Sequence, residues 1–213
     1  MIHALAQSVL KRLRLYATYS LHVKGYLRDV GWFRSFEEER SVDAQGNPIP
    51  FITYPAIDFL TRRVNKDWSV FEYGSGASTL WWAGRVREVF ACEHHQGWFE
   101  RVKSQAPANV TLFHVPLEYG GAYCSKVLDF PNHFDIIVID GRDRGRCARN
   151  AVQSLNPGGV IIWDNSERSY YHDAQNDLLG QGFRRIEFVG MAPIANETSE
   201  TTIFYRPGNC LGI

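Results

Sequence analysis

Residues 69–79 read Ser-Val-Phe-Glu-Tyr-Gly-Ser-Gly-Ala-Ser-Thr, and this stretch decides the fold. Its first half is a short apolar run of the kind that forms a buried strand. Gly74 and Gly76 follow at once, and residues 80–82 (Leu-Trp-Trp) continue as a helical segment. Glycines at a strand-to-helix junction let the backbone turn tightly and approach a ligand, whose negative group can meet the helix N-terminus. The stretch therefore predicts a nucleotide-type pocket.

Short apolar runs alternate with helical segments on the C-terminal side of this stretch. Because apolar strands separated by crossover helices are typical of a parallel sheet covered on both faces, the pattern predicts a doubly wound α/β fold. A last helix is predicted near 168–180, before two final strands joined by a loop. The predicted strands are 69–73, 88–92, 110–115, 135–139, 159–163, 183–189 and 201–206.

Glu93 ends the second predicted strand, 17 residues beyond Gly76. In a doubly wound fold an acid at about this spacing reaches a ribose diol, because one carboxylate can accept from two hydroxyl groups. A surface acid at a strand end is the plainer alternative. A strand end that faces a glycine loop favours the ribose interpretation.

Four motifs lie at the ends of the predicted strands. They are Glu72-Tyr-Gly-Ser-Gly, Glu93, Phe134-Asp-Ile-Ile-Val-Ile-Asp140-Gly and Leu155-Asn-Pro-Gly-Gly-Val-Ile-Ile-Trp-Asp164-Asn165. Together they resemble the class I S-adenosylmethionine-dependent methyltransferase family, over about residues 69–206. The resemblance implies a Rossmann-like, mostly parallel, seven-stranded sheet in which one late antiparallel strand inserts beside the sixth.

The same resemblance implies which residues hold S-adenosylmethionine. The methionine end would lie on the glycine loop, the ribose on the second-strand acid and the adenosine near the residue that follows it. The cofactor-binding residues expected in this way are Glu72, Gly74, Ser75, Gly76, Glu93, His94 and Asp140.

Asp140, Asp164 and Asn165 resemble one branch of that family more closely, the catechol-type and caffeoyl-type O-methyltransferases. In that branch the three residues bind a divalent cation, and hard oxygen ligands suit Mg²⁺. The branch also has a lysine three positions after the first Asp, where this chain has Asp143. The alternative is that the three residues line the substrate pocket without a metal. Asp140, Asp164 and His172 are the candidate catalytic residues.

Four arginines follow the fourth predicted strand closely. Guanidinium groups there can grip a phosphate or carboxylate of a substrate, or they can form a solvated helix face with ordinary ion pairs. The four are Arg142, Arg144, Arg146 and Arg149.

Residues 1–28 contain five basic residues and no acidic one, with apolar residues at helical spacing. This predicts a basic amphipathic helix, followed by a connecting loop over 29–50. The helix either packs on the main domain, forms a homodimer, or contacts an anionic membrane peripherally. The predicted organisation is therefore a 1–50 extension and a 51–213 methyltransferase domain.

Composition narrows the class of protein further. The chain has 213 residues with 23 basic and 23 acidic ones, so its net charge of zero lacks the electrostatic footprint of a nucleic-acid binder. Its four cysteines are far apart, which indicates a reducing compartment rather than a disulfide framework. No apolar stretch reaches the roughly 20 residues of a membrane span. We expect a cytoplasmic protein, and the alternative is a protein associated with a membrane through the N-terminal helix.

The function predicted from these observations is methyl transfer from S-adenosylmethionine to a small-molecule or glycan acceptor, on oxygen. Two alternatives stay open. An NAD(P)-dependent oxidoreductase would share Gly74, Gly76 and Glu93, although no Tyr-x-x-x-Lys pair follows them. A non-catalytic module could bind the cofactor or tether a partner through residues 1–50.

Overall fold

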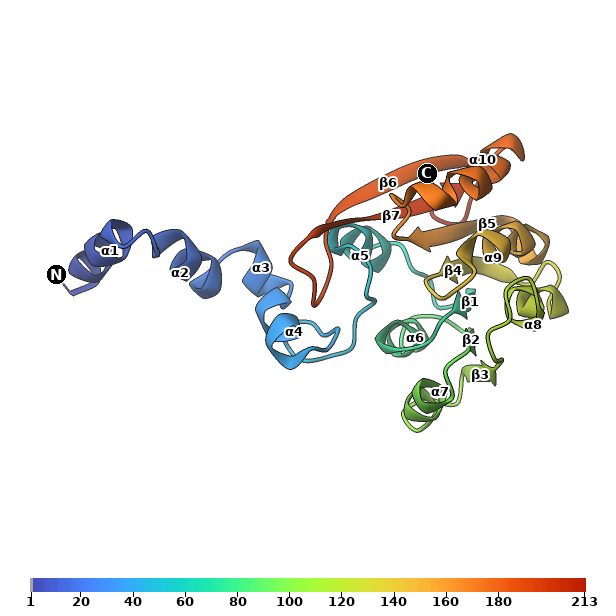
Figure 1. Ribbon diagram of the computed structural model, residues 1–213, viewed down its shortest axis with the longest axis horizontal. Coiled ribbons are helices and arrows are strands. Elements are labelled where there is room, and N and C mark those ends of the chain that lie inside the picture. The colour runs from blue at the N-terminus through green and yellow to red at the C-terminus, as the bar shows by residue number, and fades with distance from the viewer. Residues whose placement is uncertain (1) are drawn as a thin grey trace.

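One seven-stranded sheet forms the centre of the protein, in the order β3-β2-β1-β4-β5-β7-β6. The computed structural model describes the backbone of residues 2–213 and the side chains from residue 7 onward. Figure 1 shows the sheet with helices on both sides of it. The strands are β1 (Ser69–Tyr73), β2 (Glu88–Glu93), β3 (Val110–His114), β4 (Phe134–Ile139), β5 (Leu155–Asp164), β6 (Arg184–Met191) and β7 (Thr198–Tyr205).

The strand directions confirm the predicted doubly wound sheet. β1 lies between β2 and β4 and is parallel to both, and β5 continues the parallel series beside β4. β7 enters between β5 and β6 and is antiparallel to each. The order reverses at β1 and β4, and ligands of open α/β sheets bind at the carboxyl ends of the strands at such a switch point.

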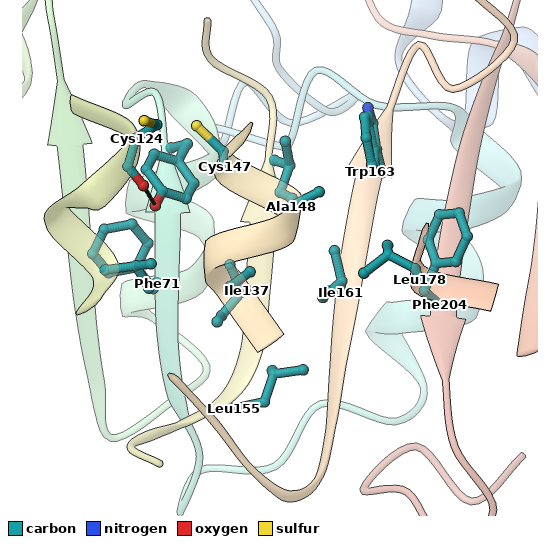
Figure 2. Close-up of a cluster of buried hydrophobic side chains, with 14 of the residues drawn as sticks. Phe71, Cys124, Ile137, Cys147, Ala148, Leu155, Ile161, Trp163, Leu178 and Phe204 are labelled. Carbon is teal, nitrogen blue, oxygen red and sulfur yellow. Dashed lines mark hydrogen bonds between the residues drawn. The ribbon is translucent and has the colours of Figure 1, made fainter. Parts of the chain in front are cut away.

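Alternation along the strands divides the core into two layers. Phe71, Ile137 and Ile161 face one side, where they pack with side chains of α8, α9 and α10, as Figure 2 shows for several of them. Val70 and Ile136 face the other side and pack with α5 and α6. Both faces of a parallel sheet must be covered in this way, which is why its strands are continuously apolar.

From residue 54 onward, the helices lie in the segments between strands where the sequence predicted them. Pro55 stands in the first turn of α5, where its missing N–H leaves no helical hydrogen bond unmade. The helices of this part are α5 (Tyr54–Thr61), α6 (Ala77–Ala83), α7 (Gln96–Lys103), α8 (Ala122–Ser125), α9 (Arg144–Ala151) and α10 (His172–Gly180), with short 3₁₀ turns η1 (Lys126–Asp129), η2 (Val152–Ser154) and η3 (Ser169–Tyr171).

The N-terminal segment is not the single helix that the sequence predicted. It forms α1 (Ile2–Arg12), α2 (Tyr16–Val23), α3 (Tyr26–Asp29) and α4 (Trp32–Glu38). Arg14 has a φ of +60° and Gly25 a φ of +112°, so the chain leaves the right-handed helical region at both positions. Apolar periodicity cannot reveal such breaks, because it continues through them. Figure 1 shows this segment projecting away from the sheet.

Two further findings concern cysteines and membrane spans. All four cysteines are free thiols, and Cys92, Cys124 and Cys147 are buried. Within the part of the chain that the structure describes, no helix is long and apolar enough to cross a bilayer.

Candidate functional site

The loop after β1 turns on Gly74. Its φ of +94° lies in the left-handed region that favours glycine. Gly76 has instead an extended backbone, with φ 166°, and its N–H donates to Thr79 Oγ1 over 3.0 Å at the start of α6. A Cβ added at Gly76 would lie 3.6 Å from Trp98 Nε1, an ordinary contact. The tight turn into α6 therefore depends on the first glycine of the pair.

Glu93, at the end of β2, is tied to this loop. Its Oε2 accepts from the N–H of Ser75 (3.1 Å) and from the Ser75 hydroxyl (3.2 Å), and its Oε1 accepts from the N–H of His95 (2.8 Å). The hydroxyl is the one donor of the three that can rotate away. A ligand hydroxyl can therefore take its place on a carboxylate that the two backbone groups hold still.

A cavity of about 590 Å³ opens at the carboxyl ends of β1, β2, β4 and β5. Among residues 7–213, four charged residues are buried, and all four line this cavity. Burying a charge costs free energy unless the group is paired, and such groups gather at functional sites. The four are Glu72, Glu93, Arg144 and Asp164.

Two buried polar atoms of the cavity wall have no hydrogen-bond partner, Glu72 Oε2 and His94 Nδ1. His94 Nδ1 lies 3.1 Å from Glu93 Oε1, but without hydrogen-bond geometry. Burial raises the pKa of Glu72 to about 7, against the lowering effect of nearby Thr79 and Ser78. An orphaned carboxyl oxygen and an orphaned imidazole nitrogen fit a ligand that brings a cationic group and a polar edge.

Asp140 follows β4, Asp164 ends β5, and Arg144 lies between the two. Arg144 Nη2 donates to Asp140 Oδ1 over 2.9 Å, and Nη1 lies 3.8 Å from Asp164 Oδ2. The same guanidinium donates to the backbone carbonyls of both aspartates. Thr201 on β7 donates its hydroxyl to Asp164 Oδ1 over 2.9 Å. The first turn of α9 therefore clamps the ends of two neighbouring strands.

The two aspartates titrate together. Burial and then the neighbouring Asp140 raise the pKa of Asp164, Arg144 lowers it, and the result is a pKa of about 8. Burial also raises the pKa of Asp140, whose side chain keeps 29% exposure. Two carboxyls in one buried site do not both ionise readily, so near neutral pH the pair retains a proton.

The predicted Mg²⁺ site does not fit this arrangement. The cation between Asp140 and Asp164 is the guanidinium of Arg144, and Asn165 Nδ2 is turned to Ser199 Oγ (3.1 Å). Over the described residues there is no group of three or more His, Cys, Asp and Glu side chains placed to hold a metal ion. The prediction failed because the sequence places the three oxygen ligands on adjacent strand ends but does not show what lies between them.

The remaining predicted site residues lie in the main cavity, in a neighbouring cavity and on the exposed start of α10. Ser75, His94 and Asn165 line the cavity. Gly76 lines a neighbouring cavity of about 600 Å³, which shares Ser75 and Asp140 with the first. His172 begins α10, is exposed, and lies outside the residues that line either cavity. The structure does not bring His172 to the aspartate pair.

Sequence reasoning missed two parts of this site. Arg144 was assigned to a group of arginines that most simply form a solvated face, yet it is buried. Its position four residues after Asp140, in the first turn of a helix, is the signal that could have indicated an ion pair. The wall formed by residues 192–199 was also missed, since it belongs to a loop with no motif.

The sheet order and the site together define a class. An all-parallel dinucleotide-binding sheet has the order 3-2-1-4-5-6, whereas here an antiparallel strand enters between the fifth and sixth positions. This is the arrangement that the sequence resemblance implies. The fold is that of the class I S-adenosylmethionine-dependent methyltransferases.

Solved structures with this fold resemble the chain. An S-adenosylmethionine-dependent O-methyltransferase from Thermotoga maritima is 16% identical, with a TM-score of 0.55, over 74% of this chain and 67% of that one. The precorrin-8W decarboxylase of Methanobacterium thermoautotrophicum is 21% identical, with a TM-score of 0.54, over 79% and 97%.

The precorrin-6Y C5,15-methyltransferase of Geobacter metallireducens is 14% identical, with a TM-score of 0.53, over 80% of this chain and 96% of that one. At these identities the likeness is one of fold. No protein-family model matches the sequence, and no curated protein matches it either.

Proposed function

We propose that this protein is an S-adenosylmethionine-dependent methyltransferase that methylates a hydroxyl oxygen of a polar small-molecule or glycan acceptor. The observation that carries the proposal is the gathering of all four buried charged residues of the described side chains around one cavity at the switch point of a methyltransferase-type sheet. The fold of the neighbours supports this activity over nicotinamide-dependent hydride transfer.

The cofactor half of the cavity has a matching donor and acceptor set. Glu93 would accept from the ribose hydroxyls after the Ser75 hydroxyl rotates, and Glu72 Oε2 would accept from the amino group of the methionine end. His94 Nδ1 would meet a polar edge of the adenosine. When bound, S-adenosylmethionine supplies a sulfonium methyl group already activated for attack.

The acceptor half is built from polar side chains. Beyond Asp140 and Asp164, the wall is formed mostly by polar and charged residues. Its apolar members are few, namely Phe51, Tyr73, Ala192 and Ala195. A flat aromatic acceptor would need apolar walls, whereas a hydroxyl-rich acceptor needs many donors and acceptors. The wall residues are Arg142, Asn165, Glu167, Arg168, Glu197, Thr198 and Ser199.

Asp140 is the group that we assign to the acceptor proton. Its partly exposed carboxyl lines the cavity, and its raised pKa makes it a stronger base than an ordinary aspartate when it is ionised. Arg144 holds it in place, and the more deeply buried Asp164 retains the shared proton. The rest of catalysis is alignment of the hydroxyl oxygen with the methyl group, which can supply on the order of 7 to 11 kcal/mol.

Calorimetric titration of the purified protein with S-adenosylmethionine, S-adenosylhomocysteine and NAD⁺ tests the cofactor assignment. We expect binding of the first two, and Glu93→Ala to weaken it at least tenfold, about 1.4 kcal/mol, because a charge-assisted hydrogen bond is lost. Glu93→Gln should lose less. Unchanged affinity in Glu93→Ala, or preferential binding of NAD⁺, contradicts the assignment. Cofactor binding without methyl transfer to any hydroxyl-rich acceptor would point to the non-catalytic module.

A further inference from the structure

The N-terminal helices leave an unusual surface uncovered. We call residues 7–30 the arm. None of its residues is buried, although it contains α2, α3 and the second half of α1. Figure 1 shows the arm extending away from the sheet rather than lying along it. The contacts of the arm with the main domain lie at its C-terminal end, where Tyr26 meets the ring of Tyr54 and Val30 packs against the core.

The arm exposes large apolar side chains at high density. Among residues 7–213, half of the exposed large hydrophobic side chains lie in this short segment, each with 46% to 59% of its surface exposed. Tyr19 and Val23 are four residues apart on α2 and therefore lie on one face of it. A high local density of exposed apolar side chains is typical of a site of interaction. The side chains are Val9, Leu13, Leu15, Tyr19, Leu21, Val23 and Tyr26.

The charges of the arm up to residue 28 have one sign, and its one acidic residue is Asp29. Residues 1–28 hold five basic residues and no acidic one, so all 23 acidic residues of the chain lie in residues 29–213. The five are Lys11, Arg12, Arg14, Lys24 and Arg28. In the described structure none of their side chains forms an ion pair with a carboxylate, and Lys11 lies instead over the ring of Tyr16.

We propose that the arm docks on the surface of an anionic lipid bilayer. Exposed apolar and aromatic side chains beside unpaired basic residues are the combination that binds the headgroup region, where the former are buried and the latter meet lipid phosphates. A second copy of the arm is the poorer occupant. Two arms side by side would bring ten basic residues together against only two acidic ones, Asp29 of each copy, and like charges repel.

The helix that follows the arm, α4, touches the wall of the main cavity. Trp32 Nε1, in α4, donates to the carbonyl of Ala195 over 2.7 Å, and Ala195 lines the cavity. Docking of the arm would therefore hold this wall close to the bilayer. The docking itself does not depend on the proposed methyl transfer.

Vesicle flotation of the full chain tests the proposal. The probes are vesicles of phosphatidylcholine alone and of phosphatidylcholine mixed with phosphatidylglycerol. We expect the protein to float with the mixed vesicles only, and to be released progressively by salt. Lys11→Glu should weaken partitioning at least fivefold, since each basic residue near an anionic surface contributes about that factor. Leu13→Ser should weaken it as well.

Matched controls lie on the body of the protein. Lys66→Glu changes an exposed lysine near the end of α5, and Val189→Ser changes an exposed apolar side chain on β6. Both should leave flotation as in the wild type. Absence of flotation, equal flotation with both vesicle types, or equal effects of Lys11→Glu and Lys66→Glu would overturn the proposal. So would a dimer, measured by light scattering, that Leu13→Ser dissociates.

Discussion

Glu72 has a carboxyl group that folding removes from water without giving its Oε2 a partner. Its pKa is raised to about 7 in the folded protein, from an ordinary value near 4.5. The folded state therefore binds a proton more tightly than the unfolded chain between these two pH values. The contribution of protonated Glu72 to the stability of the fold is fully present below about pH 4.5 and is lost as the pH rises through 7.

This pH dependence of stability predicts how Glu72→Gln changes the free energy of unfolding. At pH 8 the variant should be about 3 kcal/mol more stable than the wild type, because it removes a buried, unpaired charge, and at pH 4.5 the difference should nearly vanish. Urea unfolding at both pH values measures it. The same change should weaken S-adenosylmethionine binding, because the amide no longer attracts a cationic amino group. A variant that is equally stable and binds equally well would exclude this role for Glu72.

Gly74 and Gly76 should differ in what they contribute. Gly74→Ala places a side chain at a φ of +94° and should cost about 1–2 kcal/mol, or roughly 2–8 °C in melting temperature. Gly76→Ala adds a Cβ in ordinary contact with Trp98 on an extended backbone, so its melting should be unchanged. Calorimetric melting of the two variants checks this order. Equal losses would mean that the turn does not depend on Gly74.

The contact between α9 and the ends of β4 and β5 depends on one arginine. Arg144→Ala leaves the buried Asp164 and the partly exposed Asp140 without their cation, which should destabilise the fold by about 3 kcal/mol at pH 8. The loss should be smaller at pH 5, where Asp164, whose pKa is raised to about 8, is protonated and needs no cation. Arg146→Ala is the control, because it breaks only the Arg146–Asp143 pair, in which the arginine side chain is 55% exposed.

Chemical unfolding at the two pH values separates the outcomes for Arg144→Ala. A loss that is independent of pH would show that the arginine acts through its backbone contacts alone. A loss of stability no larger than that of Arg146→Ala would contradict the proposed role of Arg144 in joining the ends of β4 and β5. Added Mg²⁺ should not restore the variant, because the space vacated lacks a third oxygen ligand from an acidic side chain.

The strands were predictable because each is a local property of the sequence. The predicted 69–73 coincides with β1, and the predicted 135–139 differs from β4 by one residue. The site was predictable only as far as motifs reach, so Glu72, Ser75 and Glu93 were placed in the cavity and Arg144 was not recognised. A guanidinium between two strand ends is a tertiary contact, to which apolar periodicity does not respond.

Charge and exposure divide the chain into the basic, exposed arm and an acidic body, which is the rest of the chain. Native trypsin digestion should cut first within the arm, at Arg14 and Lys24, because the backbone there is exposed and interrupted by turns. Mass spectrometry of the early products checks this. Anionic vesicles should slow these cuts, while cuts in the body should not change. First cleavage on α5 would contradict the division.

The place of β7 has a consequence for synthesis. β7 leaves the ribosome after the other six strands of this sheet, yet it lies inside the sheet, and β6 pairs with no other strand of the described chain. Until Thr198–Tyr205 emerges, the growing chain displays an open edge on β5 and carries β6 without a neighbour. Open edges invite pairing with other chains. The nascent protein therefore depends on its final strand for closure, and a ribosome that stalls before residue 198 would hold an incomplete, aggregation-prone sheet.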